Sequence, residues 1–193
     1  VPKEIKNNEN RVGLVHSGVR QLVQDGHELF VQKTAGMGIG ISDEEYITAG
    51  ATMVDTMKDA FAAGEMIIKV KEPQAVEIAL LRPHHILYTY LHLAADKPQT
   101  EGLMNSGCTA IAYETIQYPD GSLPLLVPMS EVAGRMATQV GTTFLQNDKG
   151  GKGVLLGGVP GVKRARVTVI GCGIAGTNAT KMAMGLGADV TCI

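Results

Sequence analysis

The sequence contains no tryptophan and only three phenylalanines, and aromatic residues make up 4% of its 193 positions. No apolar run reaches the roughly 18 residues that are needed to span a bilayer. No basic segment followed by an apolar one marks a signal peptide. Neither sign of charge dominates, since 17 basic and 19 acidic side chains give a formal net charge of −2. Nucleic-acid-binding domains usually carry a basic surplus, so we expect no nucleic acid as a partner. The lack of a long apolar run likewise argues against a membrane as a partner.

Cysteine is also scarce, with three residues far apart in the sequence, at Cys108, Cys172 and Cys192. An odd number without close spacing argues against a disulfide scaffold and against a thiolate zinc site, and we predict no metal site. Free cysteines are typical of a reducing compartment, so we expect a cytoplasmic protein. What the sequence does have is 45% hydrophobic residues and 24 glycines, a composition typical of a folded α/β protein with many turns.

Strand-like apolar runs alternate with helix-like segments along the chain. We expect strands at residues 27–32, 51–54, 66–70, 86–91, 109–113, 166–170 and from 188 onward. We expect helices at residues 17–25, 56–63, 74–81, 99–106, 130–146 and 175–186. The run Ser42-Asp-Glu-Glu45 predicts a capping box at the start of a further helix. Repeated β-α units predict a mainly parallel sheet that helices cover on both faces. The predicted fold class is therefore α/β, with two Rossmann-like doubly wound parallel-sheet domains.

A turn at Pro119-Asp-Gly121, followed by Pro124 and Pro128, marks the predicted boundary between the two domains. We expect an N-terminal substrate and catalytic domain at residues 1–127 and the start of a dinucleotide-binding Rossmann domain at residues 128–193. The chain begins without methionine and stops in a strand-like run. We therefore expect a fragment whose second domain is truncated.

A long helix at residues 130–146 is expected to connect the two domains. Ser130 is a typical N-cap residue, because its hydroxyl can accept a hydrogen bond from an early backbone N–H of the helix. Apolar side chains recur at every fourth position of this helix and are expected to face inward; they are Val132, Met136, Val140 and Phe144.

The run Gly171-Cys-Gly173-Ile-Ala-Gly176 has the spacing G-x-G-x-x-G, with a predicted strand before it and a predicted helix after it. In that context the pattern is typical of a dinucleotide-binding loop. Gly171 permits the tight turn, Gly173 lets the backbone approach a pyrophosphate, and Gly176 lets helix and strand pack closely. The helix N-terminus, at Ile174 and Ala175, offers backbone amides and a positive dipole end to the phosphates. A plain tight turn between strand and helix is the alternative.

Two predicted strands end beside a cationic or titratable side chain. Lys71 follows the strand at 66–70, and His92 follows the strand at 86–91. Sites in parallel sheets form beyond the carboxyl ends of strands. There a lysine can polarise a carbonyl oxygen, and a histidine can exchange a proton near neutral pH. A solvated lysine and a hydrogen-bonded structural histidine are the alternatives. Lys69 is expected to point to the other face of its strand.

Arg11 follows the polar run Lys6-Asn-Asn-Glu-Asn10. The guanidinium group is a planar fork of donors that suits bidentate binding of a substrate carboxylate. A surface arginine without such a role is the alternative.

With these residues in view, the chain closely resembles the alanine dehydrogenases over its whole length. Two characteristic runs are Lys69-Val-Lys-Glu-Pro73 and Tyr90-Leu-His-Leu-Ala-Ala95. Further matching runs lie at residues 1–12, 26–28, 110–115, 123–126, 128–135 and 150–161, together with the dinucleotide loop. The resemblance implies an NAD-dependent oxidoreductase that reversibly converts L-alanine into pyruvate and ammonia. It also implies a homo-oligomer, typically a hexamer or a dimer.

The resemblance assigns roles to individual residues. It implies that Arg11 binds the substrate carboxylate, Lys71 contacts the substrate, and His92 donates and accepts protons. It further implies cofactor contacts at Ser130 and at the backbone of Ile174 and Ala175. The acidic residue that separates NAD from NADP is expected about 20 residues after the glycine motif, beyond Ile193. The choice of NAD therefore rests on the resemblance alone.

Two other functions remain open at this point. The dinucleotide-binding subunit of the proton-pumping transhydrogenases belongs to the other branch of the same family and shares the run at 129–134. That branch lacks the combination of the runs at 69–73 and 90–95, which favours the dehydrogenase. The other alternative is that the chain by itself is only an inactive dinucleotide-binding fragment. A truncated domain with two strands should bind the cofactor poorly, and its uncovered sheet edge should favour aggregation.

Overall fold

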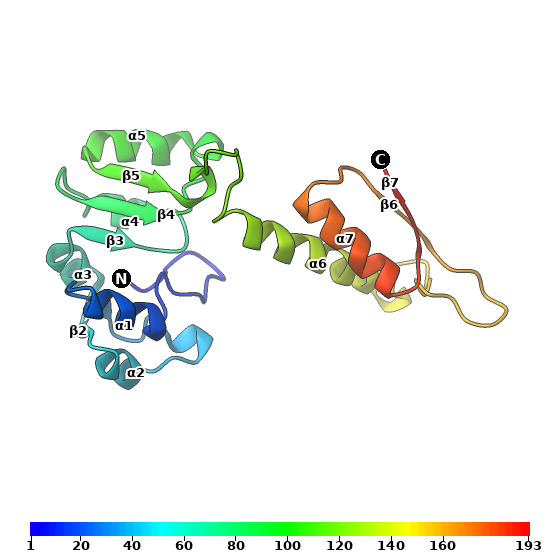
Figure 1. The fold of residues 1–193 in the computed structure, drawn as a ribbon, viewed down its shortest axis with the longest axis horizontal. Coiled ribbons are helices and arrows are strands. Elements are labelled where there is room, and N and C mark those ends of the chain that lie inside the picture. Colours follow the sequence, from blue (N-terminus) through cyan, green and yellow to red (C-terminus); the bar gives the residue numbers. More distant parts are fainter. The chain divides into compact units, whose positions relative to one another are not determined.

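A computed structural model describes all residues from Val1 to Ile193. The chain forms two compact units, Val1–Thr115 and Ile116–Ile193 (Figure 1). The division predicted at residues 127 and 128 assigns the preceding loop to the first unit, whereas the structure groups residues from Ile116 onward with the second.

The first unit alternates short helices and strands in the expected order. Its helices are α1 (His16–Gln24), α2 (Asp43–Thr48), α3 (Met57–Ala63), α4 (Ala75–Ile78) and α5 (Lys97–Ser106). Its strands are β1 (Phe30–Gln32), β2 (Thr52–Val54), β3 (Met66–Ile68), β4 (Ile86–Thr89) and β5 (Thr109–Ala112). Single 3-10 turns occur at η1 (Met37–Ile39), η2 (Leu93–Ala95) and η3 (Tyr113–Thr115).

All strand pairs of the first unit are parallel. β1 pairs with β2, and β3, β4 and β5 form a three-stranded sheet in sequence order. In the register of this sheet Ile67 lies opposite Leu87, and Leu87 lies opposite Ala110. Figure 1 shows the three strands side by side with α5 along β5. The carboxyl ends of the three strands therefore lie at one edge, and the predicted α/β fold class with parallel pairing is confirmed.

Apolar side chains of the strands are buried between the sheets and the helices. Ile67 and Leu87 are buried in one cluster with Phe61 of α3 and Leu103 of α5. Burying one such side chain contributes about 1.5–3 kcal/mol. Ser42 forms the predicted capping box with Glu45 at the start of α2, and Thr56 forms a second box with Asp59 at α3.

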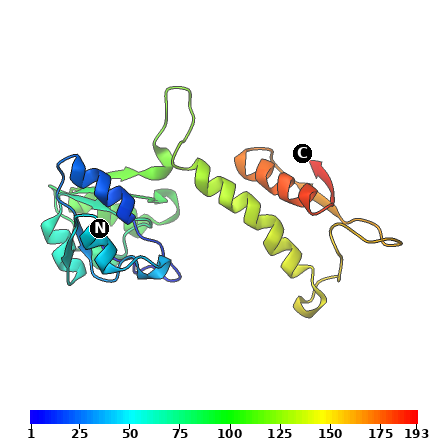
Figure 2. The same cartoon turned by 60° about the horizontal axis from the view of Figure 1, so that its bottom comes forward.

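The second unit contains two long helices and one pair of strands. Its elements are α6 (Val127–Phe144), the 3-10 turn η4 (Asn147–Lys149), β6 (Arg166–Val169), α7 (Ile174–Gly185) and β7 (Asp189–Cys192). β6 and β7 are parallel, with Val167 opposite Val190. Figure 2 shows α7 beside α6. No helix in the structure, α6 included, is long and apolar enough to cross a membrane.

Helix α6 differs from its prediction in two respects. It begins at Val127, so Ser130 lies within its first turn and does not cap it. Pro128 accounts for the earlier start, because proline is tolerated in the first turn, where its missing N–H would have no helical partner. The side chains expected to face inward are instead exposed by 45–66%; they are Val132, Met136, Val140 and Phe144.

Small residues, not the apolar stripe, determine which face of α6 packs on α7. A Cβ atom added at Gly134 would lie 2.1 Å from the carbonyl oxygen of Ala175. Thr138 Oγ1 donates to the carbonyl oxygen of Ala179 at 3.0 Å, and Arg135 Nε donates to Asn178 Oδ1 at 3.2 Å. The two helix backbones approach too closely for large side chains, so the apolar stripe lies on another face.

Replacing Gly134 by alanine should therefore destabilise the second unit. The added methyl group would overlap the backbone of α7, and overpacking of this kind costs about 1–3 kcal/mol. Thermal and denaturant unfolding of the full-length protein measure the change.

Gly141 is the matched control, because it lies in the same helix and a Cβ added there meets no atom within 4 Å. Gly141→Ala should stabilise the protein by about 0.5–1 kcal/mol through the higher helix propensity of alanine. Equal effects of the two substitutions would contradict the close approach of α6 to α7 at Gly134.

Candidate functional site

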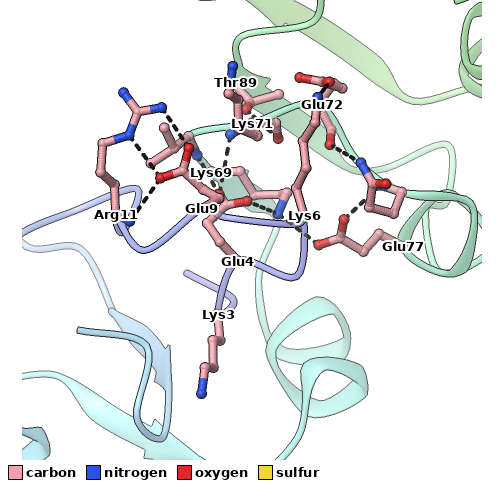
Figure 3. A network of polar contacts seen from close by, with 12 residues as sticks. Lys3, Glu4, Lys6, Glu9, Arg11, Lys69, Lys71, Glu72, Glu77 and Thr89 are labelled. Atoms are coloured by element: carbon pink, nitrogen blue, oxygen red, sulfur yellow. Dashed lines mark hydrogen bonds and ion pairs between the residues drawn. The ribbon is translucent and has the colours of Figure 1, made fainter. Parts of the chain in front are cut away.

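The carboxyl edge of the β3-β4-β5 sheet carries the polar side chains expected there. Lys71 lies three residues after the end of β3, and His92 lies three residues after the end of β4. The N-terminal segment runs past the same edge, because the carboxylate of Glu4 accepts a hydrogen bond from the backbone N–H of Val70 at 2.6 Å. Figure 3 shows the polar contacts that connect the N-terminal segment with the residues after β3.

Lys69 lies at the centre of a buried ionic cluster. Its side chain has 0% exposure, and its ammonium group lies 2.9 Å from Glu4 Oε2 and 2.8 Å from Glu77 Oε1. Both carboxylates are almost fully buried as well. The sequence-based interpretation gives Lys69 no role beyond pointing to the other face of its strand, whereas the structure shows a buried charge with two partners. Glu4 lies 65 residues away in the sequence, so no local pattern reveals it, whereas Glu77 follows in the next helix, α4.

This cluster holds the backbone that carries Lys71. The carboxylate of Glu4 accepts the N–H of Val70 and, at 3.4 Å, the N–H of Lys71. The hydroxyl of Thr89 on β4 donates to the carbonyl oxygen of Lys71 at 2.9 Å. Lys71 is thus anchored on both sides of its backbone while its own side chain is half-buried.

Arg11 is oriented by the carboxylate of Glu9. Nε of Arg11 donates to Glu9 Oε1 at 2.9 Å, and Nη2 donates to Oε2 at 2.6 Å. This bidentate pair, with a smaller contribution from Lys71, lowers the pKa of Glu9 to about 2. Because folding lowers the pKa of Glu9, the pair with Arg11 stabilises the folded protein at pH values above the ordinary carboxyl pKa. This stabilisation is lost as the pH falls through about 2. Glu9 is therefore ionised at neutral pH, and Arg11 keeps a fixed orientation.

His92 has an unusual backbone conformation. Its φ of 50° and ψ of 40° are left-handed, a region that a non-glycine residue enters at a cost of about 1–3 kcal/mol. The conformation places the His92 ring nearly parallel to the ring of Tyr90, at 6.1 Å and 10°. Burial raises the pKa of Tyr90, and the nearby charge of Arg11 opposes that rise.

The structure thus brings the three predicted residues of the first unit to one edge of the sheet. Arg11 and Lys71 both lower the pKa of Glu9. The charge of Arg11 also opposes the rise that burial causes in the pKa of Tyr90, whose ring lies nearly parallel to that of His92. In Figure 3 Arg11 and Glu9 lie at one end of the network, and Lys71 lies beside Thr89. An arginine fork, an ammonium and an imidazole at one edge can bind a small carboxylate and exchange a proton.

Sequence reasoning missed Glu4, Glu9, Tyr90 and Glu114 at this edge. For Tyr90 a signal existed, since residues two apart in an extended segment share a face and Tyr90 precedes His92 by two. Glu4 and Glu9 stand in the polar segment around Arg11 without a pattern of their own. Glu114 accepts hydrogen bonds from the N–H groups of Leu91 and His92, which lie 23 and 22 residues earlier in the sequence. No local pattern predicts these contacts.

In the second unit, the glycine motif forms the predicted turn between β6 and α7. Gly171 has a φ of +91°, which favours glycine. A Cβ at Gly176 would lie 1.8 Å from the carbonyl oxygen of Gly171, so helix and turn could not approach as they do. A Cβ at Gly173 would meet no protein atom within 4 Å. The first helical hydrogen bond is donated by Thr177 to Gly173, which leaves the earlier amides of α7 pointing out of the helix end.

This geometry fits a dinucleotide. The backbone at Gly173 is open to a group that approaches from outside, and the amides at Ile174 and Ala175 begin the helix at that point. Ser130 lies in the first turn of α6 of the same unit. Cys172 and Cys192 are both free, and the neighbouring Cys192 thiol raises the pKa of Cys172. The parallel pairing of β6 and β7 brings together residues that the sequence separates.

Parallel α/β units with a G-x-G-x-x-G turn of this shape define a class of dinucleotide-binding proteins. Within that class the sequence matches two family descriptions, "Alanine dehydrogenase/PNT, N-terminal domain" over residues 1–133 and "Alanine dehydrogenase/PNT, C-terminal domain" over residues 137–193. The chain belongs to the alanine dehydrogenase/PNT family, as the sequence resemblance predicts.

Curated relatives support the dehydrogenase branch. The chain is 56% identical to an alanine dehydrogenase of Methanococcus maripaludis over 191 residues, which cover 99% of this chain and 51% of the relative. It is 58% identical to that of Geobacillus stearothermophilus over 192 residues, with the same coverage of both proteins. It is 56% identical to that of Bacillus subtilis over 193 residues, which cover 100% of this chain and 50% of the relative. The chain spans about half the length of these relatives.

Solved structures give the same order of similarity. An L-alanine dehydrogenase superposes with a TM-score of 0.92 at 55% identity and is matched over 100% of this chain and 53% of its own. A transhydrogenase from Sinorhizobium meliloti superposes with a TM-score of 0.78 at 28% identity, over 99% of this chain and 54% of its own. The transhydrogenase is thus the more distant of these two neighbours.

Replacing Lys69 by methionine should strongly destabilise the protein. The substitution keeps the length of the side chain but leaves two buried carboxylates without their cation, which costs about 3–5 kcal/mol. Denaturant unfolding of the full-length protein measures this loss.

Lys97→Met is the matched control, since Lys97 pairs with Glu101 at 3.6 Å on the exposed face of α5. Exposed pairs of this kind contribute about 0.3–0.5 kcal/mol. If Lys69→Met unfolded at the same denaturant concentration as Lys97→Met, Lys69 would not be the cation that stabilises the buried cluster.

Proposed function

We propose that the full-length protein is an NAD-dependent alanine dehydrogenase that reversibly converts L-alanine into pyruvate and ammonia. One observation carries the proposal: Arg11, Lys71 and His92 lie at one edge of the sheet. The chain that holds them is 56–58% identical to alanine dehydrogenases. An arginine, a lysine and a histidine at one edge of the sheet fit the carboxylate, the carbonyl oxygen and the proton transfers of this reaction.

In this proposal each of the three side chains has a separate task. Arg11, oriented by Glu9, binds the substrate carboxylate and sets the direction of the Cα–H bond. Lys71, anchored by Glu4 and Thr89, polarises the carbonyl oxygen as it develops. His92 exchanges protons as water adds and ammonia leaves.

The cofactor of the proposal is NAD, held by the second unit. When bound, its nicotinamide accepts the hydride from Cα of alanine. Gly171, Gly173 and Gly176 shape a turn that would admit the pyrophosphate, and the backbone amides of Ile174 and Ala175 would bind it. Ser130 contributes a hydroxyl from the first turn of α6.

Further parts of the proposal rest on the relatives. The names of the relatives point to alanine as the substrate. We propose pyruvate and ammonia as the products, and assembly into a homo-oligomer in the cytoplasm, from the sequence resemblance to the family. A hydride-transferring subunit of a transhydrogenase is the second candidate, favoured by the structural similarity at 28% identity. The two candidates differ in one property, since only the dehydrogenase reduces NAD when L-alanine is the sole reductant.

The full-length protein should reduce NAD when L-alanine is added, measured as absorbance of the reduced nicotinamide. His92→Ala should lower the turnover number by about 10²–10⁴, because it removes the group that moves the proton. The affinity for NAD should remain near that of the wild type, because His92 belongs to the first unit and the glycine turn to the second.

NAD binding without alanine-dependent reduction in the wild type would favour the transhydrogenase subunit. Loss of NAD affinity in His92→Ala with unchanged turnover would contradict the role of this histidine. The 193-residue chain, assayed beside the full-length protein, should be inactive. Activity in the isolated chain would show that the essential groups all lie within it.

Gly173→Ala should weaken NAD binding at least about 10-fold while leaving the stability of the fold nearly unchanged. The added methyl group meets no protein atom, but it points into the space where the backbone would approach the pyrophosphate. Calorimetric titration with NAD and thermal unfolding measure the two effects.

Gly176→Ala is the comparison variant, because its methyl group would overlap the carbonyl oxygen of Gly171. This variant should lose stability and cofactor affinity together. NAD affinity of Gly173→Ala equal to that of the wild type would mean that the dinucleotide does not pass this glycine.

A further inference from the structure

Glu114 stands where the pairing of β4 with β5 ends. The last registered pair is Thr89 with Ala112. Leu91 and Glu114 lie two residues beyond this pair. There the N–H of Leu91 is bound by the side-chain carboxylate of Glu114 instead of by a backbone carbonyl of β5. It accepts the N–H of Leu91 at 3.1 and 3.2 Å through both oxygens, and the N–H of His92 at 2.7 Å through Oε1.

The backbone carbonyls of the same loop are bound as well. Gln99 Nε2 donates to the carbonyl oxygen of Leu91 at 2.7 Å, and the N–H of Ala95 donates to the carbonyl oxygen of His92 at 3.0 Å. The hydroxyl of Thr100 donates to the carbonyl oxygen of Leu93 at 3.0 Å. Among these contacts only the one with Glu114 involves a charged group, and hydrogen bonds to charged groups are about twice as strong as neutral ones.

The left-handed conformation of His92 needs such support. A non-glycine residue persists in this region only where its surroundings over-determine it. The imidazole itself is exposed, so packing does not hold it, and its parallel contact with Tyr90 follows from the backbone conformation. The direction in which the side chain leaves the backbone therefore depends on the hydrogen bonds of the backbone on either side of it.

We propose that Glu114 is a positioning residue, whose carboxylate holds the Leu91–His92 backbone so that the imidazole of His92 stands beside Tyr90 in the reactive orientation. The consequence for turnover rests on the proposed function. The consequence for the backbone does not, because it follows from the hydrogen bonds alone.

The test uses the full-length protein with Glu114→Ala, Glu114→Asp and Glu114→Gln. Alanine removes the acceptor, and aspartate keeps the charge but withdraws the oxygens by one methylene group. Glutamine keeps one oxygen in the place of Oε1, which accepts both N–H groups in the wild type. Glu101→Gln, on the exposed face of α5, is the control variant.

With L-alanine and NAD, Glu114→Ala should lower kcat by about 10–100-fold, because small displacements of a reacting group cost this much. The KM for alanine and the Kd for NAD should change by less than about threefold, since Glu9 orients Arg11 and the glycine turn belongs to the other unit. Glu114→Gln keeps only one neutral acceptor and Glu114→Asp keeps the charge at a shorter reach, so each should recover part of kcat. A parallel fall of kcat, substrate affinity and NAD affinity would instead indicate general damage and overturn the proposal.

Hydrogen–deuterium exchange gives a readout that needs no activity. The peptide with residues 90–95 should exchange faster in Glu114→Ala and Glu114→Asp than in the wild type, and the rest of the first unit should be unchanged. Wild-type exchange of this peptide in both variants would overturn the proposal. If Glu114→Ala does not fold, Glu114→Asp decides by the same criteria.

The same experiment separates the two levels of inference. A wild-type protein that does not reduce NAD with alanine would refute the proposed function. The exchange of residues 90–95 would then decide by itself whether Glu114 holds the backbone of His92.

Discussion

The arrangement of the first unit depends on the ion pairs that the buried ammonium group of Lys69 forms with Glu4 and Glu77. A charge with 0% exposure is tolerable only if opposite charges meet it, and here Glu4 and Glu77 lie within 2.9 Å. The three residues come from the N-terminal segment, the end of β3 and helix α4, so their contact fixes three separate parts of the chain at once. This cluster also positions the backbone of Lys71, because the carboxylate of Glu4 accepts hydrogen bonds from the N–H groups of Val70 and Lys71.

The same physical device recurs one strand further along the sheet. Where the ladder of β3 ends, a carboxylate accepts two successive N–H groups, and where the ladder of β4 ends, another carboxylate does the same. Unpaired backbone groups at the end of a buried strand are costly, and a nearby carboxylate satisfies them without extending the strand. The strands can therefore stop early, and the residues that follow, Lys71 and His92, leave the sheet in defined directions.

In the second unit the controlling constraint is the absence of side chains. Gly134 lets α6 approach the backbone of α7, and Gly176 lets α7 approach the turn that precedes it. The space beside both glycines is filled by neighbouring backbone, whereas Gly173 of the same turn faces open space. The motif predicts close packing at Gly176 and an open backbone at Gly173, and the structure has both, whereas no motif marks the close approach at Gly134.

The sequence by itself determined the features that local physics controls. Alternating apolar runs predicted the parallel β-α order, Ser42 and Glu45 predicted their capping box, and the glycine spacing predicted the turn after β6. Tertiary structure decided what depends on distant partners: the pairing of the buried Lys69 with Glu4, the exposed apolar stripe on α6, and the proximity of Cys172 to Cys192. Local patterns record which face of an element is apolar or which cap a helix prefers. The partner of a buried charge, and the face that a neighbouring helix covers, follow only from the long-range packing of the chain.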